Sequence, residues 1–415
     1  MGGVLMAPAV QSVADERLRR YAELALHVGC NLQPGQQLFI SASLDHAPLV
    51  RAATEIAYRD GAEYVQVLYE DEHVKRALIE GAPAAALEFS PGFAVRFSED
   101  AAAERAAFLA IRGDAEPDLF DGLDGERVGR ARMVEVSEIT SVTVSRRLIN
   151  WCVVAYPNLG WAKSVFGEPD VERLWEAVAF VNRLDEEDPV AAWDAHLARL
   201  EERRAALDER RFDAIRFRGP GTDLTVGLLP DSRWLGGATV TTSGIRHVAN
   251  LPTEEVFTTP DWRRGEGFVR ATRPLSLIGS VIRDLELRFR DGRIVDVRAS
   301  SGADIVRAET ALDEGACSLG EIALVDESSR VGRLDVVFNE LLFDENAACH
   351  LAYGSAYANA VAGAEQLENE QLRERGVNAS SVHTDFMVGG PEVEVDGLDE
   401  SGAATPLLRD NRWQL

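Results

Sequence analysis

The sequence has few cysteines and no motif that pairs them. Its 415 residues include only Cys30, Cys152, Cys317 and Cys349, which are far apart and form no CxxC. This spacing argues against a disulfide framework and against a structural zinc site. No uninterrupted apolar run reaches about 18 residues, so we expect no membrane-spanning helix. Residues 1–16 lack a basic segment, and Pro and Gln break their apolar run, so we expect no signal peptide and a cytoplasmic protein.

Basic patches and nucleotide-binding motifs are also missing. The formal net charge is −26 and no cluster of Lys and Arg interrupts the acidity, which excludes nucleic acid as a partner. No GxGxxG opens a helix after a strand, and no GxxxxGK[ST] occurs, so no nucleotide cofactor is indicated. Hydrophobic residues make up 46% and charged residues 27%, as in a soluble globular protein. We interpret most of the acidity as solvated surface charge.

The first half alternates between helical and strand patterns. Apolar spacing predicts helices over 14–28 and 44–60 and a further helix beginning near Gly125. Strands are expected at 37–41, 63–69, 108–111 and 149–155. This alternation predicts an α/β domain with a mostly parallel sheet. Trp151 and Trp161 follow, and we expect such large rings to pack at a domain interface.

A long charged helix over 194–211 leads to a second half with a different pattern. Beyond Phe212 the sequence has short strand-like runs, and Asp291-Gly292 is a strong hairpin signal. Helices are expected at 305–314 and 364–375. The change predicts two domains, an α/β domain over 1–212 and a β-rich α+β domain over 213–415.

Acids and histidines gather in four separate segments of this second half. In DENAACHLAYGSAY, the residues around His350 are small, so another part of the fold can approach its imidazole. His383 and Asp385 are two residues apart, so on a strand they would share one face. Glu254 and Glu255 are adjacent and bracketed by prolines and apolar residues. A hydrolytic metal site needs one carboxylate as a ligand and another to take a proton from water, and such a pair meets that need.

Together these segments resemble the signature segments of the M29 metallo-aminopeptidases, the thermophilic aminopeptidase T type. The likeness lies in NLPTEEVFTTPD, GEIALVD, LFDENAACHLAYGSAY and VHTDFMVGG, and it extends in the same order over nearly the whole chain. The resemblance implies an exopeptidase that removes N-terminal residues from peptides with a free N-terminus. It also implies a homodimer whose first domains restrict access, with the β-rich domain catalytic. The metal ligands that it implies are Glu255, Glu321, His350, His383 and Asp385.

The expected mechanism uses two divalent metal ions that share a water or hydroxide, with Asp385 as the bridging carboxylate. Glu254 is assigned as the general base on chemical grounds, and Glu321 or a bridging Glu255 remains its competitor. Tyr357, implied by the resemblance as a further active-site residue, is expected to donate a hydrogen bond to the developing oxyanion. Nitrogen and oxygen ligands without cysteine suit zinc, cobalt, manganese or magnesium alike.

Two other functions fit the same residues. The first is a metal-dependent or metal-independent amidohydrolase acting on non-peptide amides. The second is a non-catalytic, metal-stabilised scaffold whose first domain is an interaction surface. The sequence does not indicate the preferred N-terminal residue of a substrate.

Overall fold

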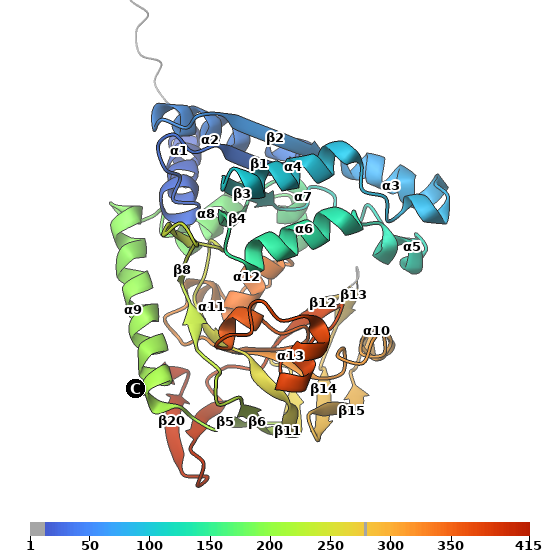
Figure 1. The fold of residues 1–415 in the computed structure, drawn as a ribbon, viewed down its shortest axis with the longest axis vertical. Coiled ribbons are helices and arrows are strands. Elements are labelled where there is room, and N and C mark those ends of the chain that lie inside the picture. Colours follow the sequence, from blue (N-terminus) through green and yellow to red (C-terminus); the bar gives the residue numbers. More distant parts are fainter. Residues whose placement is uncertain (1–12, 278–279) are drawn as a thin grey trace, which may run out of the picture.

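The computed structural model describes residues 13–277 and 280–415, and it has a helix-rich half and a strand-rich half (Figure 1). Residues 1–16, for which no signal peptide is expected, lie mostly outside the described residues. No helix in the two described ranges is long and apolar enough to cross a membrane.

The first half is built on a sheet of four parallel strands in the order β2-β1-β3-β4. Leu38 and Ile40 of β1 and Leu109 and Ile111 of β3 are buried in its core. The strands are β1 (Leu38–Ser43), β2 (Val65–Glu70), β3 (Ala107–Arg112) and β4 (Asn150–Ala155). The helices are α1 (Val13–Leu24), α2 (Ala47–Arg59), α3 (Glu72–Gly81), α4 (Gly92–Ala103), α5 (Gly125–Arg130), α6 (Val134–Ser145), α7 (Leu159–Phe166), α8 (Val171–Val181) and α9 (Pro189–Arg210). The parallel sheet predicted for this half is confirmed.

The second half contains two large antiparallel sheets that share a core, beside the two-stranded pairs β8-β9 and β12-β13. The larger has the order β15-β14-β11-β6-β5-β19-β20-β21, and the smaller has the order β18-β17-β16-β10-β7. The strands are β5 (Ala214–Gly219), β6 (Thr222–Leu228), β7 (Leu235–Gly236), β8 (Ala238–Val240), β9 (Arg246–Val248), β10 (Val256–Thr258), β11 (Pro260–Arg270), β12 (Leu275–Leu277), β13 (Ser280–Ile282), β14 (Glu286–Arg290), β15 (Arg293–Arg298), β16 (Leu319–Leu324), β17 (His350–Gly354), β18 (His383–Met387), β19 (Glu394–Leu398), β20 (Ala404–Arg409) and β21 (Arg412–Trp413). The predicted fold class, an α/β half followed by a β-rich half, is therefore confirmed.

The hairpin signal is confirmed in detail. Asp291 and Gly292 join β14 to β15, with φ angles of +49° and +73°. Positive φ at both turn residues is the geometry for which Asp-Gly is preferred in two-residue hairpins.

The helices of the second half are α10 (Ala303–Glu309), α11 (Arg330–Leu334), α12 (Leu341–Asp344) and α13 (Asn369–Arg375). Two of them are shorter than predicted. The chain turns after α10 because Asp313 Oδ1 accepts hydrogen bonds from the backbone N–H groups of Gly315 and Ala316, which replaces helix by a local turn. α13 begins only after Glu368, whose side chain caps it together with Gln371.

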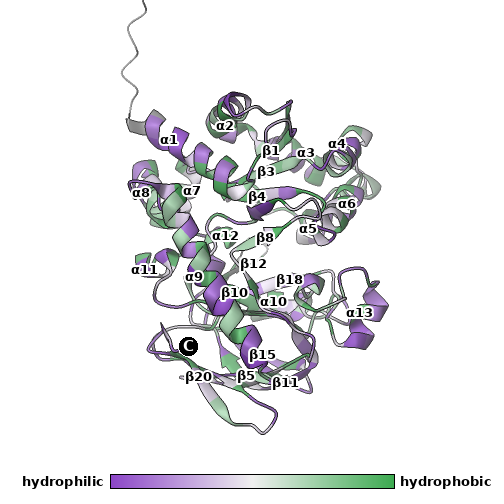
Figure 2. Ribbon diagram, turned by 60° about the vertical axis from the view of Figure 1, so that its left-hand side comes forward, coloured by the Kyte–Doolittle hydropathy of each residue, from purple (hydrophilic) through white to green (hydrophobic). Residues whose placement is uncertain are grey.

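The two halves are in close contact, as the tryptophan prediction expected. Trp161 Nε1 donates to the carbonyl of Phe338 at 2.6 Å, and the Trp151 ring lies beside His247. The core of the first half also takes in Val248, Leu251 and parts of 331–347. α9 runs along both halves, and Figure 2 shows hydrophilic and hydrophobic residues alternating along it. A domain boundary near residue 212 stays a prediction.

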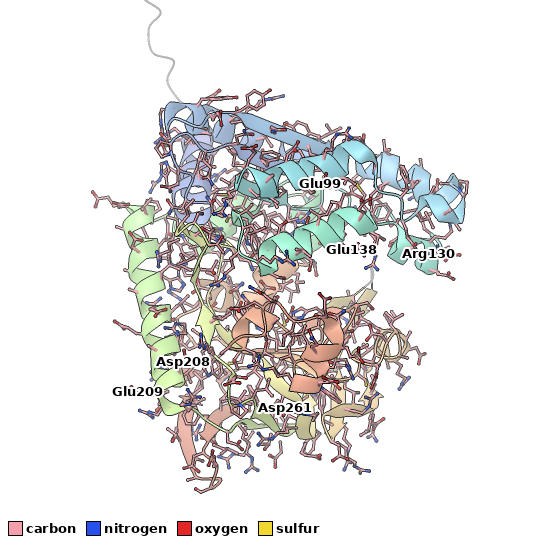
Figure 3. All side chains as sticks on the ribbon, viewed as in Figure 1. Glu99, Arg130, Glu138, Asp208, Glu209 and Asp261 are labelled. Carbon is pink, nitrogen blue, oxygen red and sulfur yellow. The ribbon has the colours of Figure 1, made fainter. Side chains whose placement is uncertain are left out.

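Much of the acidic charge is solvated. Glu99 of α4 and Glu138 of α6 are exposed, and so is Glu209 near the end of α9 (Figure 3). The buried carboxylates are therefore the exception, and several of them gather on the smaller sheet.

Candidate metal centre

Three adjacent strands of the smaller sheet carry most of the predicted ligands. Glu321 on β16 and Asp385 on β18 both pair with Ala352 of β17, so they lie in one row across the sheet. His350 opens β17, and His383 opens β18 opposite Gly354. Paired residues of an antiparallel sheet point to the same face, so the register brings these side chains together. Glu255 joins them from the residue before β10.

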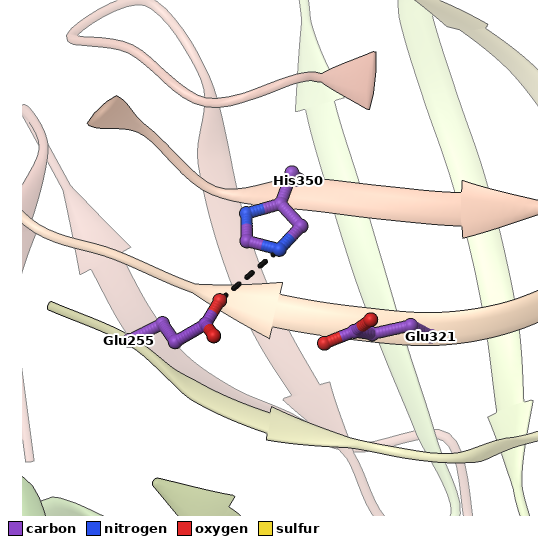
Figure 4. Close-up of side chains that lie close together, drawn as sticks. All are labelled: Glu255, Glu321 and His350. Atoms are coloured by element: carbon purple, nitrogen blue, oxygen red, sulfur yellow. Dashed lines mark ion pairs between the residues drawn. The ribbon is translucent and has the colours of Figure 1, made fainter. Parts of the chain in front are cut away.

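The side chains meet around two histidine nitrogens. His350 Nε2 lies 3.1 Å from Glu255 Oε2 and 3.9 Å from Asp385 Oδ1 (Figure 4 shows the first pair, with Glu321 beside it). His383 Nε2 lies 3.2 Å from Glu321 Oε2 and 3.6 Å from Asp385 Oδ1. Asp385 therefore lies between the two imidazoles.

These contacts define two overlapping groups whose ligand atoms lie within 4.8 Å of one another. One group is Glu255, Glu321 and His350, and the other is Glu321, His383 and Asp385. Glu321 belongs to both. The structure thus brings all five predicted ligands into one place.

The donor set has the properties that a divalent cation requires. Glu255 Oε2 and Asp385 Oδ1 are buried and have no hydrogen bond of normal geometry; their close neighbours are the imidazole Nε2 atoms of His350, at 3.1 Å from Glu255, and of His383, at 3.6 Å from Asp385. A buried carboxylate oxygen without a donor is costly unless a cation or proton neutralises it. Imidazole and carboxylate ligands without sulfur suit several divalent first-row metals as well as magnesium.

The distal nitrogens of both histidines face backbone carbonyls. His383 Nδ1 lies 2.7 Å from the carbonyl of Ser355, and His350 Nδ1 lies 3.3 Å from that of Ala348. A carbonyl accepts a hydrogen bond from Nδ1–H, which leaves the Nε2 lone pair available as a metal ligand. Gly354, opposite His383, is needed for the close packing of β17 against β18: its φ is +101°, and a Cβ there would lie 2.2 Å from the carbonyl oxygen of Val382.

The buried charges shift one another's protonation. Burial, together with the charges of Asp385 and Glu255, raises the pKa of Glu321 to about 7. Burial alone would lower the pKa of His350, but the carboxylates of Glu255, Asp385 and Glu321 outweigh it and raise this pKa to about 10. Without cations the histidines therefore hold protons that a metal ion would displace.

Tyr357 lies at the edge of this cluster. Its ring is 5.1 Å from that of His383 and 5.2 Å from that of Phe257. Tyr357 as a whole is 43% exposed. Desolvation of its hydroxyl beside the carboxylates still raises its pKa above the ordinary value, so the phenol keeps its proton. It is available as a hydrogen-bond donor beside the cluster, as the predicted function requires.

Glu254 points away from the other predicted residues. Its carboxylate accepts hydrogen bonds from Arg183 Nη2 at 2.9 and 3.1 Å, and it lies 3.5 Å from His196 Nε2. It belongs to neither group of ligand atoms. The general-base assignment to Glu254 stays a prediction, and this placement strengthens its competitors.

The sequence reasoning missed one carboxylate at the site. Glu345 opens a short helical turn, Glu345–Ala347, that packs against β18, and burial together with the charges of Glu255 and Asp385 raises its pKa. The available signal was its position five residues before His350 in the same segment.

Its neighbour Asp344 is structural instead: it accepts hydrogen bonds from the backbone N–H groups of Phe338 and Glu340. Cys349 packs in the core, where Sγ donates to the carbonyl of Val325.

Comparison with known proteins places the chain in a family. The model of the thermophilic metalloproteases (M29) matches residues 14–413. The chain belongs to this family. It is 44% identical to aminopeptidase T of Thermus aquaticus, covering 96% of this chain and 98% of the relative, and 43% identical to aminopeptidase T of Thermus thermophilus, covering 95% and 98%. The structure of wild-type AmpT from Thermus thermophilus superposes with a TM-score of 0.89 at 41% identity, over 96% of this chain and 99% of that one.

These matches confirm the resemblance to the M29 family and the prediction that the chain is a hydrolytic enzyme of the metalloprotease class. The relatives are named aminopeptidases, in agreement with the predicted enzyme class, a metallo-aminopeptidase.

Proposed function

We propose that this M29 metalloprotease is an aminopeptidase that works with two divalent cations, held by Glu255, Glu321, His350, His383 and Asp385. The observation that carries the proposal is the pair of ligand groups sharing Glu321, with buried oxygens of Glu255 and Asp385 that face the two imidazoles without a hydrogen bond of normal geometry. When bound, the ions supply Lewis acidity that makes water a nucleophile at neutral pH. Zinc, cobalt, manganese and magnesium are all compatible with the donor set.

The chain's own residues supply the remaining steps. Asp385, between the two imidazoles, and Glu321, common to both groups, are the carboxylates that would help to hold both ions. Tyr357 donates a hydrogen bond to the oxyanion that develops on the scissile carbonyl. A nearby carboxylate takes the proton from water and passes it to the leaving amine. By position Glu345 and Glu321 compete with Glu254 for this last step.

The substrates are peptides with a free N-terminus, because an exopeptidase site must bind the α-amine. We further propose that the protein is a cytoplasmic homodimer. Size-exclusion chromatography with light scattering measures its mass and so tests the dimer. A monomeric mass at micromolar concentration would contradict the homodimer.

Cleavage of leucyl-p-nitroanilide beside its N-acetylated analogue tests the activity. We expect hydrolysis of the free amine only, its loss in EDTA, and its return when zinc or cobalt is added. Cleavage of the blocked analogue alone would favour an amidohydrolase acting on non-peptide amides. Absence of any hydrolysis by the metal-loaded protein would favour a non-catalytic scaffold.

A further inference from the structure

Glu254 is one of the least accessible charged residues of the chain. The side chains of Glu254 and its partner Arg183 are 1% and 4% exposed. Taking two charges out of water is costly, and a buried ion pair often adds little to stability compared with apolar residues of similar size. The pair therefore needs another explanation.

The Arg183 guanidinium is fixed from several directions. Its Nη1 donates to the carbonyl of Val181 at 3.2 Å, and its Cζ lies 4.5 Å over the ring of Trp193. Trp193 is itself held, because its Nε1 donates to the carbonyl of Asn182 at 2.9 Å. Arg183 is thus a rigid anchor in the connection between α8 and α9.

The backbone on either side of Glu254 is held as well. His196 Nε2 lies 2.8 Å from the carbonyl of Thr253, and the N–H of Glu254 donates to Asn346 Oδ1 at 2.6 Å. Asn346 is fully buried and donates in turn to the carbonyl of Leu342 at 3.0 Å. These contacts join the ligand segment at Glu255 to the segment that carries Glu345.

Adjacent side chains in this segment face opposite ways. Glu254 contacts Arg183, whereas Glu255 contacts His350. Fixing Glu254 on one side therefore sets the direction of Glu255 on the other. Outer contacts of this kind hold metal ligands in place, and their loss typically weakens metal binding about 10–100-fold.

From this geometry we infer that the Arg183–Glu254 pair is a positioning device that holds Glu255 and the Asn346 segment ready for the cation. The inference rests on the proposed function, since it concerns the same metal centre. It assigns to Glu254 a position outside the chemical step, in place of the general base expected from the sequence.

Two variants separate positioning from proton transfer. Arg183→Met removes the guanidinium but keeps a long, unbranched side chain. Glu254→Gln keeps an acceptor for Arg183 but removes the charge. We expect Arg183→Met to raise the dissociation constant of the metal about 10–100-fold, and Glu254→Gln to raise it less. In both, the lost kcat should largely return at saturating metal.

Two measurements do not depend on turnover. Calorimetric titration of the metal-free protein with zinc gives the dissociation constant. Amide hydrogen exchange of the 251–256 segment in the metal-free protein should be faster in Arg183→Met than in the unmodified chain. Arg203→Met is the matched control, because Arg203, on α9, forms another buried pair, with Asp326 at 3.1 and 2.5 Å. It should leave zinc affinity and exchange of this segment unchanged.

Glu254→Gln keeps the test decisive if Arg183→Met fails to fold. A loss of at least about a hundredfold in kcat at saturating metal, with unchanged zinc affinity, would overturn the inference and identify Glu254 as the base. Unchanged affinity and exchange in a folded Arg183→Met variant would overturn it too. If the unmodified chain binds no zinc and cleaves no peptide, the proposed function itself fails.

Discussion

At the level of single residues, the metal centre is a set of groups whose protonation must change when cations bind. The pKa of His350 is raised to about 10, that of His383 is raised well above its ordinary value, and that of Glu321 is raised to about 7. At pH 7 the metal-free protein therefore holds protons on both imidazoles and on part of the Glu321 carboxyl. Divalent cations need these groups deprotonated.

Metal binding should accordingly release protons and strengthen as the pH rises. We expect more than two protons per chain to be released at pH 7 when the centre fills. Calorimetric titrations in buffers of different ionisation enthalpy measure this number. A value near zero would contradict the protonated state described here.

The same shifts set the stability of the metal-free protein. A folded pKa above the unfolded value means that the folded state holds the proton more tightly. The contribution of His350 is therefore fully present below about pH 6.5, its unfolded value, and is lost as the pH rises through about 10. Urea unfolding of the metal-free protein at pH 6.5 and pH 9.5 should show lower stability at the higher pH.

Removing the Tyr357 hydroxyl tests its part in the chemistry. Because the phenol lies beside the cluster and keeps its proton, Tyr357→Phe should keep the metals while kcat falls about 10²–10³-fold. Elemental analysis measures the bound metal, and steady-state kinetics measure kcat. Loss of metal from the variant would indicate a ligand instead of a hydrogen-bond donor.

At the level of elements, the centre depends on the register of β16, β17 and β18. The spacing of His383 and Asp385 predicted that they share one face of a strand, whereas the full set of five ligands came from the family resemblance and stays a prediction. The sequence could not give the direction of Glu254, whose partner Arg183 is 71 residues away. Nor could it show that Glu345 reaches the site while its neighbour Asp344 caps the backbone.

A buried network on these strands offers a test of how the sheet is held. Tyr353 on β17 and Thr384 on β18 both donate to the carboxylate of Glu309, at 2.5 and 3.1 Å. Tyr353→Phe leaves a buried carboxylate oxygen without its donor, so it should cost about 1–3 kcal/mol in the free energy of unfolding. Metal content should be kept. Tyr64→Phe, at an exposed site, should change stability by less than about 0.5 kcal/mol.

At the level of the whole molecule, the two halves share contacts near the centre. Alternating periodicity was enough to predict the parallel sheet of the first half, and the Asp-Gly turn was enough to predict one hairpin of the second. The sequence did not predict that α9 and the α8–α9 connection bring Arg183 and His196 to the ligand segment. Such contacts depend on packing between residues far apart in the chain.

Cations should also stabilise the fold as a whole. They bind the folded state and neutralise the buried carboxylates, so a cation at 100 times its dissociation constant adds about 2.7 kcal/mol per site. Differential scanning calorimetry should show a lower Tm after EDTA and its recovery with zinc. An unchanged Tm would show that the centre does not bind cations under these conditions.

Counting the cations that restore activity tests the central claim most directly. The metal-free protein is titrated with zinc or cobalt while leucyl-p-nitroanilide hydrolysis and bound metal are followed together. We expect activity to reach its maximum at two equivalents per chain. A maximum at one equivalent, or full activity in EDTA with no bound metal, would contradict a two-cation centre.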